Sequence, residues 1–454
     1  MASSVRAGRS VEEMKTAARA AIDRGGDRPV NLARTILGTP ETGFKEFTSS
    51  AAVADALRGI GLEVRDRVAI TGLVARIEGS GPGPNIAIIG ELDALPVPEH
   101  PYADHETGAA HACGHHCQTA SMMAAAIGLL ESGVMDSLAG SVTLMAVPAE
   151  EYVELGWRNE QRRSGRIEFL GGKPEFVRLG EFDDVDMAMM THVMTAADTE
   201  PEPKSFLLGG TNNGMIAKFV RFHGVSAHAG GAPHRGVNAL NAAHIAIAGI
   251  HAQRETYRDD DAVRIHPIIT RGGAVVNAVP DDVRMEMFVR AASVEAVKDA
   301  SAKVDRALRA GALAVGGSVE ITTLPGYLPL RPAPSLIDLH RANAAALVGA
   351  GQIAEAGHRS SSTDMGDITQ IMPGLHPWVG GATGRSAHAE DMVVHDYDLA
   401  VLSAGKAMAM TVIDLLVDGA AGASRVLSEH EPAMTRRQYL DTLRGMFSER
   451  TYTE

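Results

Sequence analysis

The residues NIAII at positions 85–89 form a short run in which only Asn85 is polar. Such a run is typical of a strand buried on both faces of a sheet. A helical pattern rich in Ala and Met follows at 118–130, and a second apolar run, SVTLMAV, follows at 141–147. This order of strand, helix and strand predicts a mostly parallel sheet with helices on both faces. Ligands of such sheets bind beyond the carboxyl ends of the strands.

The flanking segments extend this α/β pattern and interrupt it once. Residues 11–38 and 48–60 have apolar positions at helical spacing, so we expect two helices before the sheet. Between residues 205 and 326 the order changes to strand, helix, two strands and helix. We therefore expect a catalytic α/β domain made of residues 1–204 and 327–454, with a smaller α+β domain inserted at 205–326.

Composition and charge exclude several classes of protein. The chain has 454 residues, of which 45% are hydrophobic and 22% charged, as in ordinary soluble proteins. Its formal net charge of -14 argues against a nucleic-acid-binding surface, which needs clustered Lys and Arg. No apolar run reaches the roughly 18 residues that span a bilayer, and the start MASSVRAGRSVEEMK has no apolar signal core. We expect a cytoplasmic protein without a membrane segment.

The densest group of reactive side chains is HACGHHC at 111–117. It holds both cysteines of the chain, Cys113 and Cys117, so reduced thiols are expected rather than a disulfide framework. Thiolate and imidazole are ligands of zinc and related divalent metals, and Cys113 and His115 can hold one ion together. A polar turn without metal is the alternative interpretation.

Three weaker groups follow strand-like runs or a glycine-rich loop. Glu150 and Glu151 come after the run at 141–147, and adjacent carboxylates can divide labour, one binding metal while the other moves protons. His192 follows another apolar run, and His388 lies in the loop GRSAHAED. Alone, each is more often a solvated strand end or a structural histidine. Together they supply donors for one ion, or for two ions about 3.5–4 Å apart.

Eight motifs in one order resemble the M20 metallopeptidase and amidohydrolase family, in the style of its aminoacylase and aminobenzoyl-glutamate hydrolase branch. They are GELDALPVPEH, HACGHHCQTA, PAEE, GGKPEFVRLGEF, THVM, GVSAHAGGAPHRGVNALNA, GGAVVNAVPDD and SSTDMGDITQ. The resemblance covers about residues 40 to 391. It implies that the inserted domain serves as a dimerisation and lid unit of a homodimer.

The resemblance also implies roles for single residues. The implied metal ligands are Cys113, His115, Glu151, His192 and His388, which would hold one or two divalent ions of Zn, Mn or Co per subunit. Glu150 corresponds to the general base, and His228 to a histidine that holds the scissile carbonyl oxygen. Asn277 and Arg290 correspond to positions that bind a polar or carboxylate group of the substrate. Asp93 is a candidate for orienting a ligand histidine, with a turn-capping role as the alternative.

Two features depart from the family pattern. His116 stands where the family usually has Asp or Asn, and Cys117 adds a second thiol, so an alternative ligand set or a single-metal site stays open. Residues 152–166 are rich in Arg and include Tyr152 and Trp157. They predict either a patch that attracts a carboxylated aromatic substrate or an ordinary surface helix.

The leading hypothesis is a metal-dependent hydrolase that cleaves the amide of N-acyl amino acids, aromatic ones included, with Glu150 as general base. The alternatives are a dipeptidase, an aromatic aminohydrolase that releases ammonia from an aminobenzoate-like compound, and a non-catalytic metal- or ligand-binding protein. The expected partners are a carboxylated small molecule and a second copy of the chain. Neither nucleic acid nor membrane is expected.

Overall fold

The computed structural model describes residues 9–453. Residues 1–8, on which the expected absence of a signal segment partly rests, and Glu454 lie outside this range. The chain forms two compact units. The first unit holds the described residues up to Gly210, Arg331–Gly357 and Ile371–Ala433, and the second holds Thr211–Leu330, His358–Gln370 and the described chain from Met434. The second unit thus contains most of the expected insert and also two segments that the sequence places in the catalytic domain.

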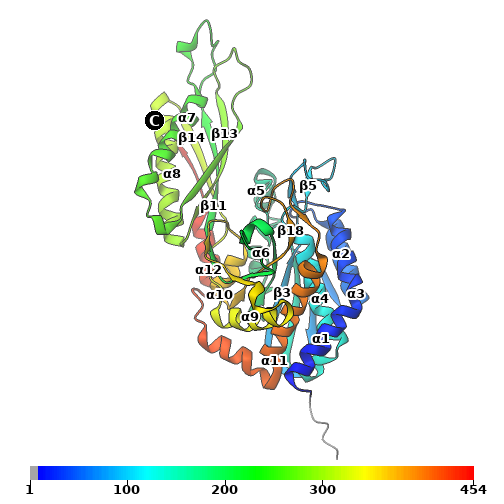
Figure 1. Ribbon diagram of the computed structural model, residues 1–454. Helices are drawn as coiled ribbons and strands as arrows, with labels where there is room; N and C mark the ends of the chain where they lie inside the picture. Colours follow the sequence, from blue (N-terminus) through cyan, green and yellow to red (C-terminus); the bar gives the residue numbers. More distant parts are fainter. Residues whose placement is uncertain (1–8, 454) are drawn as a thin grey trace, which may run out of the picture. The chain divides into compact units, whose positions relative to one another are not determined.

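A six-stranded sheet forms the centre of the first unit (Figure 1). In spatial order its strands are β1 (Val64–Val68), β2 (Gly72–Glu78), β6 (Ala139–Val147), β3 (Gly81–Glu91), β7 (Met187–Met189) and β17 (Gly374–Leu375). Strand β3 is parallel to β6 and β7, and β7 is parallel to β17, while β1 and β2 are antiparallel at one edge. The mostly parallel α/β sheet is confirmed, so β3, β6 and β7 end at the same edge.

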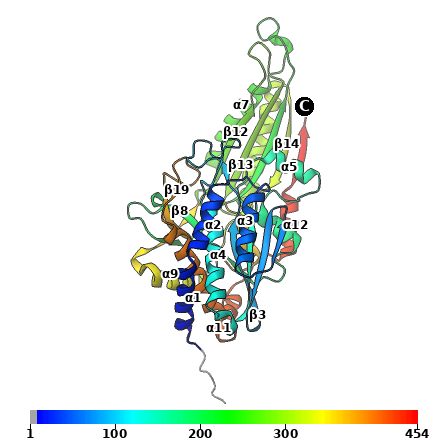
Figure 2. The ribbon, with the colours of Figure 1, turned by 90° about the vertical axis from the view of Figure 1, so that its right-hand side faces the viewer.

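Helices flank this sheet, and α4 (His115–Glu131) packs against β3 (Figure 2). Helix α4 also contacts α1 (Val11–Gly25) and α2 (Asp27–Leu37), which together replace the single helix predicted at 11–38. The prediction of two N-terminal helices is wrong, because three form with α3 (Phe47–Gly59). Pro29 lacks an N–H and cannot continue a helix, so the chain turns after Gly25 and Pro29 lies in the first turn of α2.

One helical span of the described residues, Asp398–Glu429, is long and apolar enough by length and composition to cross a membrane. No such span was predicted from the sequence, because charged residues such as Lys406 and Asp414 interrupt its apolar pattern. The most apolar part of this span is 72% buried inside the protein, and α11 (Ala404–Glu429) packs against α1, α4 and α9 (Pro334–Val348). The span is therefore a core segment of the first unit, interrupted by non-helical backbone at Val417–Ala420, and is weak evidence for a membrane segment.

A smaller sheet in the first unit carries two of the predicted ligand segments. Strand β8 (His192–Thr195) is parallel to β18 (Trp378–Thr383), and His192 is in register with Trp378. The other strands of this sheet are β9 (Phe206–Leu208), β15 (Ile353–Glu355) and β19 (Val393–Val394). The turn from β18 to β19 contains His388, so both histidines come from the same small sheet.

The second unit is built on an antiparallel five-stranded sheet. Its strands, in spatial order, are β12 (Arg264–Arg271), β13 (Asp282–Ala291), β11 (Gly214–His223), β14 (Ser318–Pro325) and β20 (Ser448–Tyr452). Helices α7 (Ala239–Ala252) and α8 (Val294–Val315) pack on each other and on this sheet. Because β20 pairs with β14, the C-terminal segment with α12 (Arg436–Met446) belongs to this unit.

Candidate metal centre

Three of the predicted reactive residues of the first unit, Asp93, Glu150 and Glu151, lie just beyond the ends of strands of its central sheet. Strand β3 ends at Glu91, two residues before Asp93, and β6 ends at Val147, shortly before Glu150 and Glu151. The carboxyl ends of neighbouring parallel strands meet at one edge of a sheet. Sequence segments about sixty residues apart therefore come together here.

The turn before α4 brings Cys113 close to His192. Gly114 has φ 85°, and a Cβ added there would lie 2.8 Å from the Val193 side chain, so glycine allows both the turn and the close approach. The Cys113 Sγ lies 3.3 Å from the His192 Nε2. Cys113, His115 and His192 offer three donor atoms that all lie within 4.8 Å of one another.

Both histidines of this group have a fixed orientation. The Nδ1 of His115 donates to the Asp93 carbonyl oxygen at 2.8 Å, and the Nδ1 of His192 donates to the Val193 carbonyl oxygen at 2.6 Å. With the proton on Nδ1, each ring presents the lone pair of its Nε2. Ligand histidines of metal sites are oriented in this way.

A second group of donor atoms shares Cys113 with the first. Cys113, Glu151 and His388 also offer donor atoms within 4.8 Å of one another, and the His388 Nε2 lies 2.9 Å from the Glu151 Oε1. The backbone N–H of His388 donates to the Ala112 carbonyl oxygen at 2.8 Å, which ties this loop to the turn of Cys113. The five predicted ligands thus form two groups with the thiol of Cys113 in common.

Asp93 connects the carboxylate pair to the histidine. Its Oδ1 accepts the backbone N–H of Glu150 at 3.1 Å, and its Oδ2 accepts that of Glu151 at 2.8 Å. Its carbonyl oxygen accepts the His115 Nδ1–H described above. One buried residue therefore positions the backbone of both glutamates and the ring of one histidine.

Sequence reasoning missed Glu91, which forms a third donor group with His115 and Glu150. Glu91 and Lys173 are fully buried and form an ion pair, and the Glu91 Oε2 lies 3.1 Å from the His115 Nε2. Two signals were available in the sequence, namely a carboxylate at the strand end in GELDAL and a lysine inside the otherwise apolar start of GGKPEF.

The ionisable groups of the centre shift one another's pKa values. Burial and Glu151 raise the pKa of the Cys113 thiol, but His192, His388 and His115 outweigh them and hold it at about 6. The Glu151 carboxylate raises the pKa of His388 to about 12 against the effect of burial. Burial raises the pKa of Glu151, yet His388 and the other neighbours lower it to about 2. These shifts show that the thiol, the carboxylate and the imidazoles interact strongly in one buried place, where the His115 Nε2 and the Glu91 Oε2 have no hydrogen-bond partner.

The two residues that depart from the family pattern lie outside these donor groups. Cys117 is fully buried in the hydrophobic core, and burial raises the pKa of its thiol. The ring of His116 is buried 5.4 Å from that of His111. Among the described residues, neither side chain belongs to a group of three donors.

The Arg-rich segment forms α5 (Leu155–Arg163), and its central arginine is structural. Arg158 is fully buried, donates to the Leu170 carbonyl oxygen at 2.9 Å and lies over the Phe44 ring. Tyr152 is buried, and Lys45 lies 4.5 Å from the ring centre of Trp157. The exposed charge is therefore smaller than the sequence suggests.

The remaining predicted residues all belong to the second unit. His228 and Asn277 are neighbours, because the N–H of Ala229 donates to the Asn277 carbonyl oxygen and His228 forms a bridge with Ala278. Arg290 lies near the far end of β13, eight residues after Asp282 and so roughly 27 Å along the strand. The structure brings the first two together and holds Arg290 apart from them.

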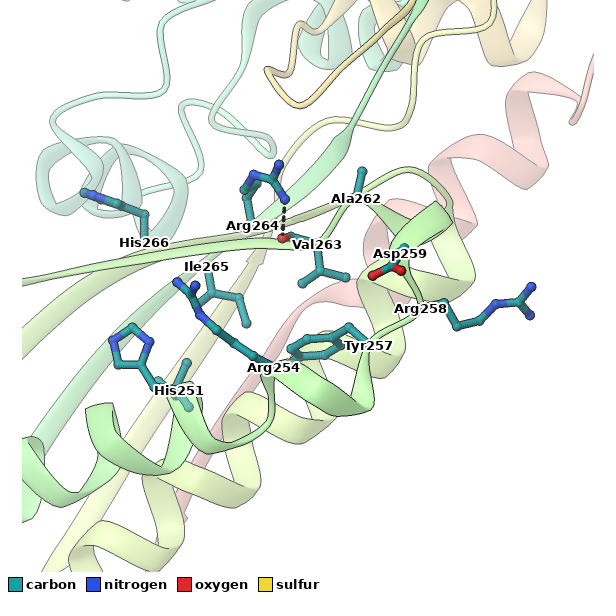
Figure 3. Close-up of a pocket in the computed structure, with 11 residues that line it drawn as sticks. His251, Arg254, Tyr257, Arg258, Asp259, Ala262, Val263, Arg264, Ile265 and His266 are labelled. Carbon is teal, nitrogen blue, oxygen red and sulfur yellow. Dashed lines mark hydrogen bonds between the residues drawn. The ribbon is translucent and has the colours of Figure 1, made fainter.

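A cavity of about 430 Å³ lies in the second unit between the end of α7 and β12 (Figure 3). Its polar lining is mostly basic, with His251, Arg254, Arg258, Arg264 and His266. The only carboxylate in the lining is Asp259, and no cysteine is present. This cavity therefore lacks the donor set of the centre described above.

Comparison with known proteins gives a family model that matches part of the chain and several relatives that match more of it. Residues 211–315 match the model described as peptidase dimerisation domain. A Xaa-Arg dipeptidase of Mus musculus is 27% identical over 429 residues, 89% of this chain and 90% of the relative. An N-acetyl-L-cysteine deacetylase of Bacillus subtilis is 29% identical over 58% of each chain, and an indole-3-acetyl-aspartic acid hydrolase of Enterobacter agglomerans is 28% identical over 76% and 77%.

Solved structures share the fold over most of the chain. A protein described as an aminohydrolase of methicillin-resistant Staphylococcus aureus superposes with a TM-score of 0.69 at 20% identity, covering 88% of this chain and 100% of its own. A Bacillus subtilis protein described as a dinuclear metal binding peptidase superposes with a TM-score of 0.63 at 23% identity, covering 87% and 99%.

Proposed function

Because this chain belongs to the M20 family of metal-dependent peptidases and amidohydrolases, we propose that it hydrolyses the amide bond of N-acyl amino acids, including aromatic ones. The enzyme is a hydrolase of carbon–nitrogen bonds that uses a divalent metal. The observation that carries the hydrolytic activity is the pair of donor groups sharing Cys113 beside the adjacent carboxylates Glu150 and Glu151, and the choice of N-acyl amino acids follows the relatives. A site that only stores metal has no use for a second carboxylate placed to move protons.

We propose Cys113, His115 and His192 as one ligand group and Cys113, Glu151 and His388 as the other. Buried acceptor atoms without hydrogen-bond partners and a thiol with a lowered pKa fit divalent ions. Thiolate and imidazole donors favour zinc or cobalt, and manganese remains compatible with the carboxylates. When bound, such ions lower the pKa of a water molecule and polarise a carbonyl group.

In this proposal Glu150 handles the protons. Its Oε2 lies 3.9 Å from the His115 Nε2, so it borders the first ligand group. From there it can take a proton from the attacking water and return it to the leaving amine. Glu151 instead faces His388, and Asp93 holds the backbone of both residues so that their side chains serve different tasks.

His228 is proposed to hydrogen-bond the scissile carbonyl oxygen. Its Nδ1 accepts the backbone N–H of Gly230 at 3.2 Å and of Gly231 at 3.0 Å, so a neutral ring carries its proton on Nε2. The side chain is exposed, and this Nε2–H is the donor that a carbonyl needs. Asn277 lies beside it and is proposed to bind a polar group of the substrate, while Arg290 would bind a carboxylate at a separate place.

The enzyme is also proposed to be a cytoplasmic homodimer formed through the second unit. Strand β12 is an edge strand, and Ile268 and Ile269 on it are 53% and 43% exposed, as are apolar side chains of α7. An unpaired apolar edge is suited to association with a second copy. Light scattering of Ile268→Glu should give monomers, whereas Phe47→Glu, an exposed apolar position of the first unit, should stay dimeric. The two cysteines are free, which fits a reducing compartment.

The experiment for the activity combines metal analysis with product analysis. Purified protein is assayed for bound metal and for release of free amine from N-acyl amino acids and dipeptides, and for ammonia from aminobenzoates. Amine release from N-acyl amino acids supports the proposal. The mouse relative favours dipeptide hydrolysis as the second candidate, which the same panel distinguishes. Ammonia release with intact amides would refute both.

A further inference from the structure

The ion pair of Glu91 and Lys173 has no part in the mechanism proposed above, although it borders the metal centre. Glu91 is the last residue of β3, and Lys173 lies in the first turn of α6 (Gly172–Leu179). Both side chains are fully buried. Burying two charges costs free energy that a single ion pair seldom repays, so a pair retained at this place calls for a function.

The close packing of α6 against the sheet edge positions Lys173. A Cβ added to Gly172 would lie 1.7 Å from the carbonyl oxygen of Pro148, so only glycine permits this approach. Pro148 is two residues before Glu150, and Lys173 therefore enters the centre from the side of the carboxylate pair. The Lys173 Nζ donates a hydrogen bond to the Glu91 Oε1.

The second oxygen of Glu91 is directed at the centre. Its Oε2 has no hydrogen-bond partner and lies 3.1 Å from the His115 Nε2, which has none either. Because the His115 Nδ1 donates to the Asp93 carbonyl, the neutral ring presents a lone pair to this oxygen. Two acceptors at this separation repel each other unless a positive charge lies between them.

In metal-free protein this separation suits an ion pair with a protonated His115, and it also suits two ligands that share one ion. Nitrogen and oxygen donors bound about 2.1 Å from one ion at a right angle lie about 3 Å apart. We infer that Glu91 is a further ligand of the ion held by His115 and His192. Lys173 is its positioning residue, because it occupies Oε1 and leaves Oε2 alone to bind.

This inference rests on the proposed metal-dependent function and is tested by metal binding rather than by turnover. Co²⁺ is added to metal-free protein, bound ions per subunit and their affinities are measured by chelator competition, and absorption spectra are recorded. Two variants are compared, Glu91→Gln and the double variant Glu91→Gln with Lys173→Met. The single change leaves the buried charge of Lys173 without its carboxylate, and the double variant removes that charge. Glu175→Gln is the matched control, because Glu175 is equally buried but is bonded to Arg178 and to the backbone of Phe169.

We expect both Glu91 variants to bind one of the Co²⁺ ions about 10- to 100-fold more weakly than the wild type does. The visible absorption bands of that ion should also shift. The cobalt–thiolate band should persist, because Cys113 also belongs to the other ligand group. Glu175→Gln should match the wild type, and circular dichroism checks that all variants fold. Two ions bound by the Glu91 variants with wild-type affinity and spectrum would overturn this inference alone. A wild type that binds no Co²⁺ would overturn the proposed function as well.

Discussion

Asp93→Asn tests how the carboxylate pair is positioned. Asp93 is 1% exposed, and its two carboxylate oxygens accept the backbone N–H groups of Glu150 and Glu151 at 3.1 and 2.8 Å. Asparagine has one acceptor oxygen, so its NH₂ group would face the second N–H. The variant loses one charge-assisted hydrogen bond and leaves a buried N–H unpaired, which should lower the free energy of unfolding by about 2–4 kcal/mol. Displacement of Glu150 should lower kcat about 10- to 100-fold.

The assay is urea unfolding of metal-free protein followed by circular dichroism, because bound metal would add its own contribution to stability. The kcat for an N-acyl amino acid is measured on the metal-loaded protein. Asp186→Asn is the control, since its Oδ2 accepts only the Asn85 N–H and asparagine keeps one such oxygen. If Asp93→Asn unfolds within about 0.5 kcal/mol of the wild type and keeps its kcat, Asp93 does not position the pair and the reasoning is refuted.

Three further predictions concern protons and metal. Glu150→Gln should lower kcat by about 10²- to 10⁴-fold with unchanged metal content, and a variant with normal kcat would remove Glu150 as general base. Burial and Asp93 raise the pKa of Glu46 to about 8 from its usual value of 4.5. Between these two pH values the folded state therefore binds one more proton than the unfolded state. The free energy of unfolding should then fall by up to about 1.4 kcal/mol per pH unit as the pH rises from 4.5 to about 8. Glu46→Gln should remove this pH dependence. Chelator treatment should lower the melting temperature, and Zn²⁺ at 1,000 times its Kd should restore it by raising the free energy of unfolding by about 4 kcal/mol. Equal stability with and without metal would contradict a preformed centre.

Much of the first unit could be predicted because its signals are local. The run at 85–89 is buried in β3, and the helical pattern at 118–130 lies in α4, since burial on both sides of a sheet requires such runs. The five elements predicted in the insert correspond to β11, α7, β12, β13 and α8, each within about five residues, but β14 was not predicted. The N-terminal helices were miscounted because periodicity continues across Gly25 while the backbone at Pro29 cannot.

By itself, the sequence determined which residue types stand at the strand ends and in which order, because apolar periodicity and ligand clusters are properties of neighbouring residues. Only the tertiary structure decided that Cys113 is shared by two donor groups, that Glu91 faces His115 and that Arg158 is buried. It also placed β20 on the sheet of the second unit, although SERTY is too polar to be recognised as a strand from its pattern. These facts depend on contacts between distant segments, and such contacts are set by the packing and register of the sheets rather than by any one stretch of chain.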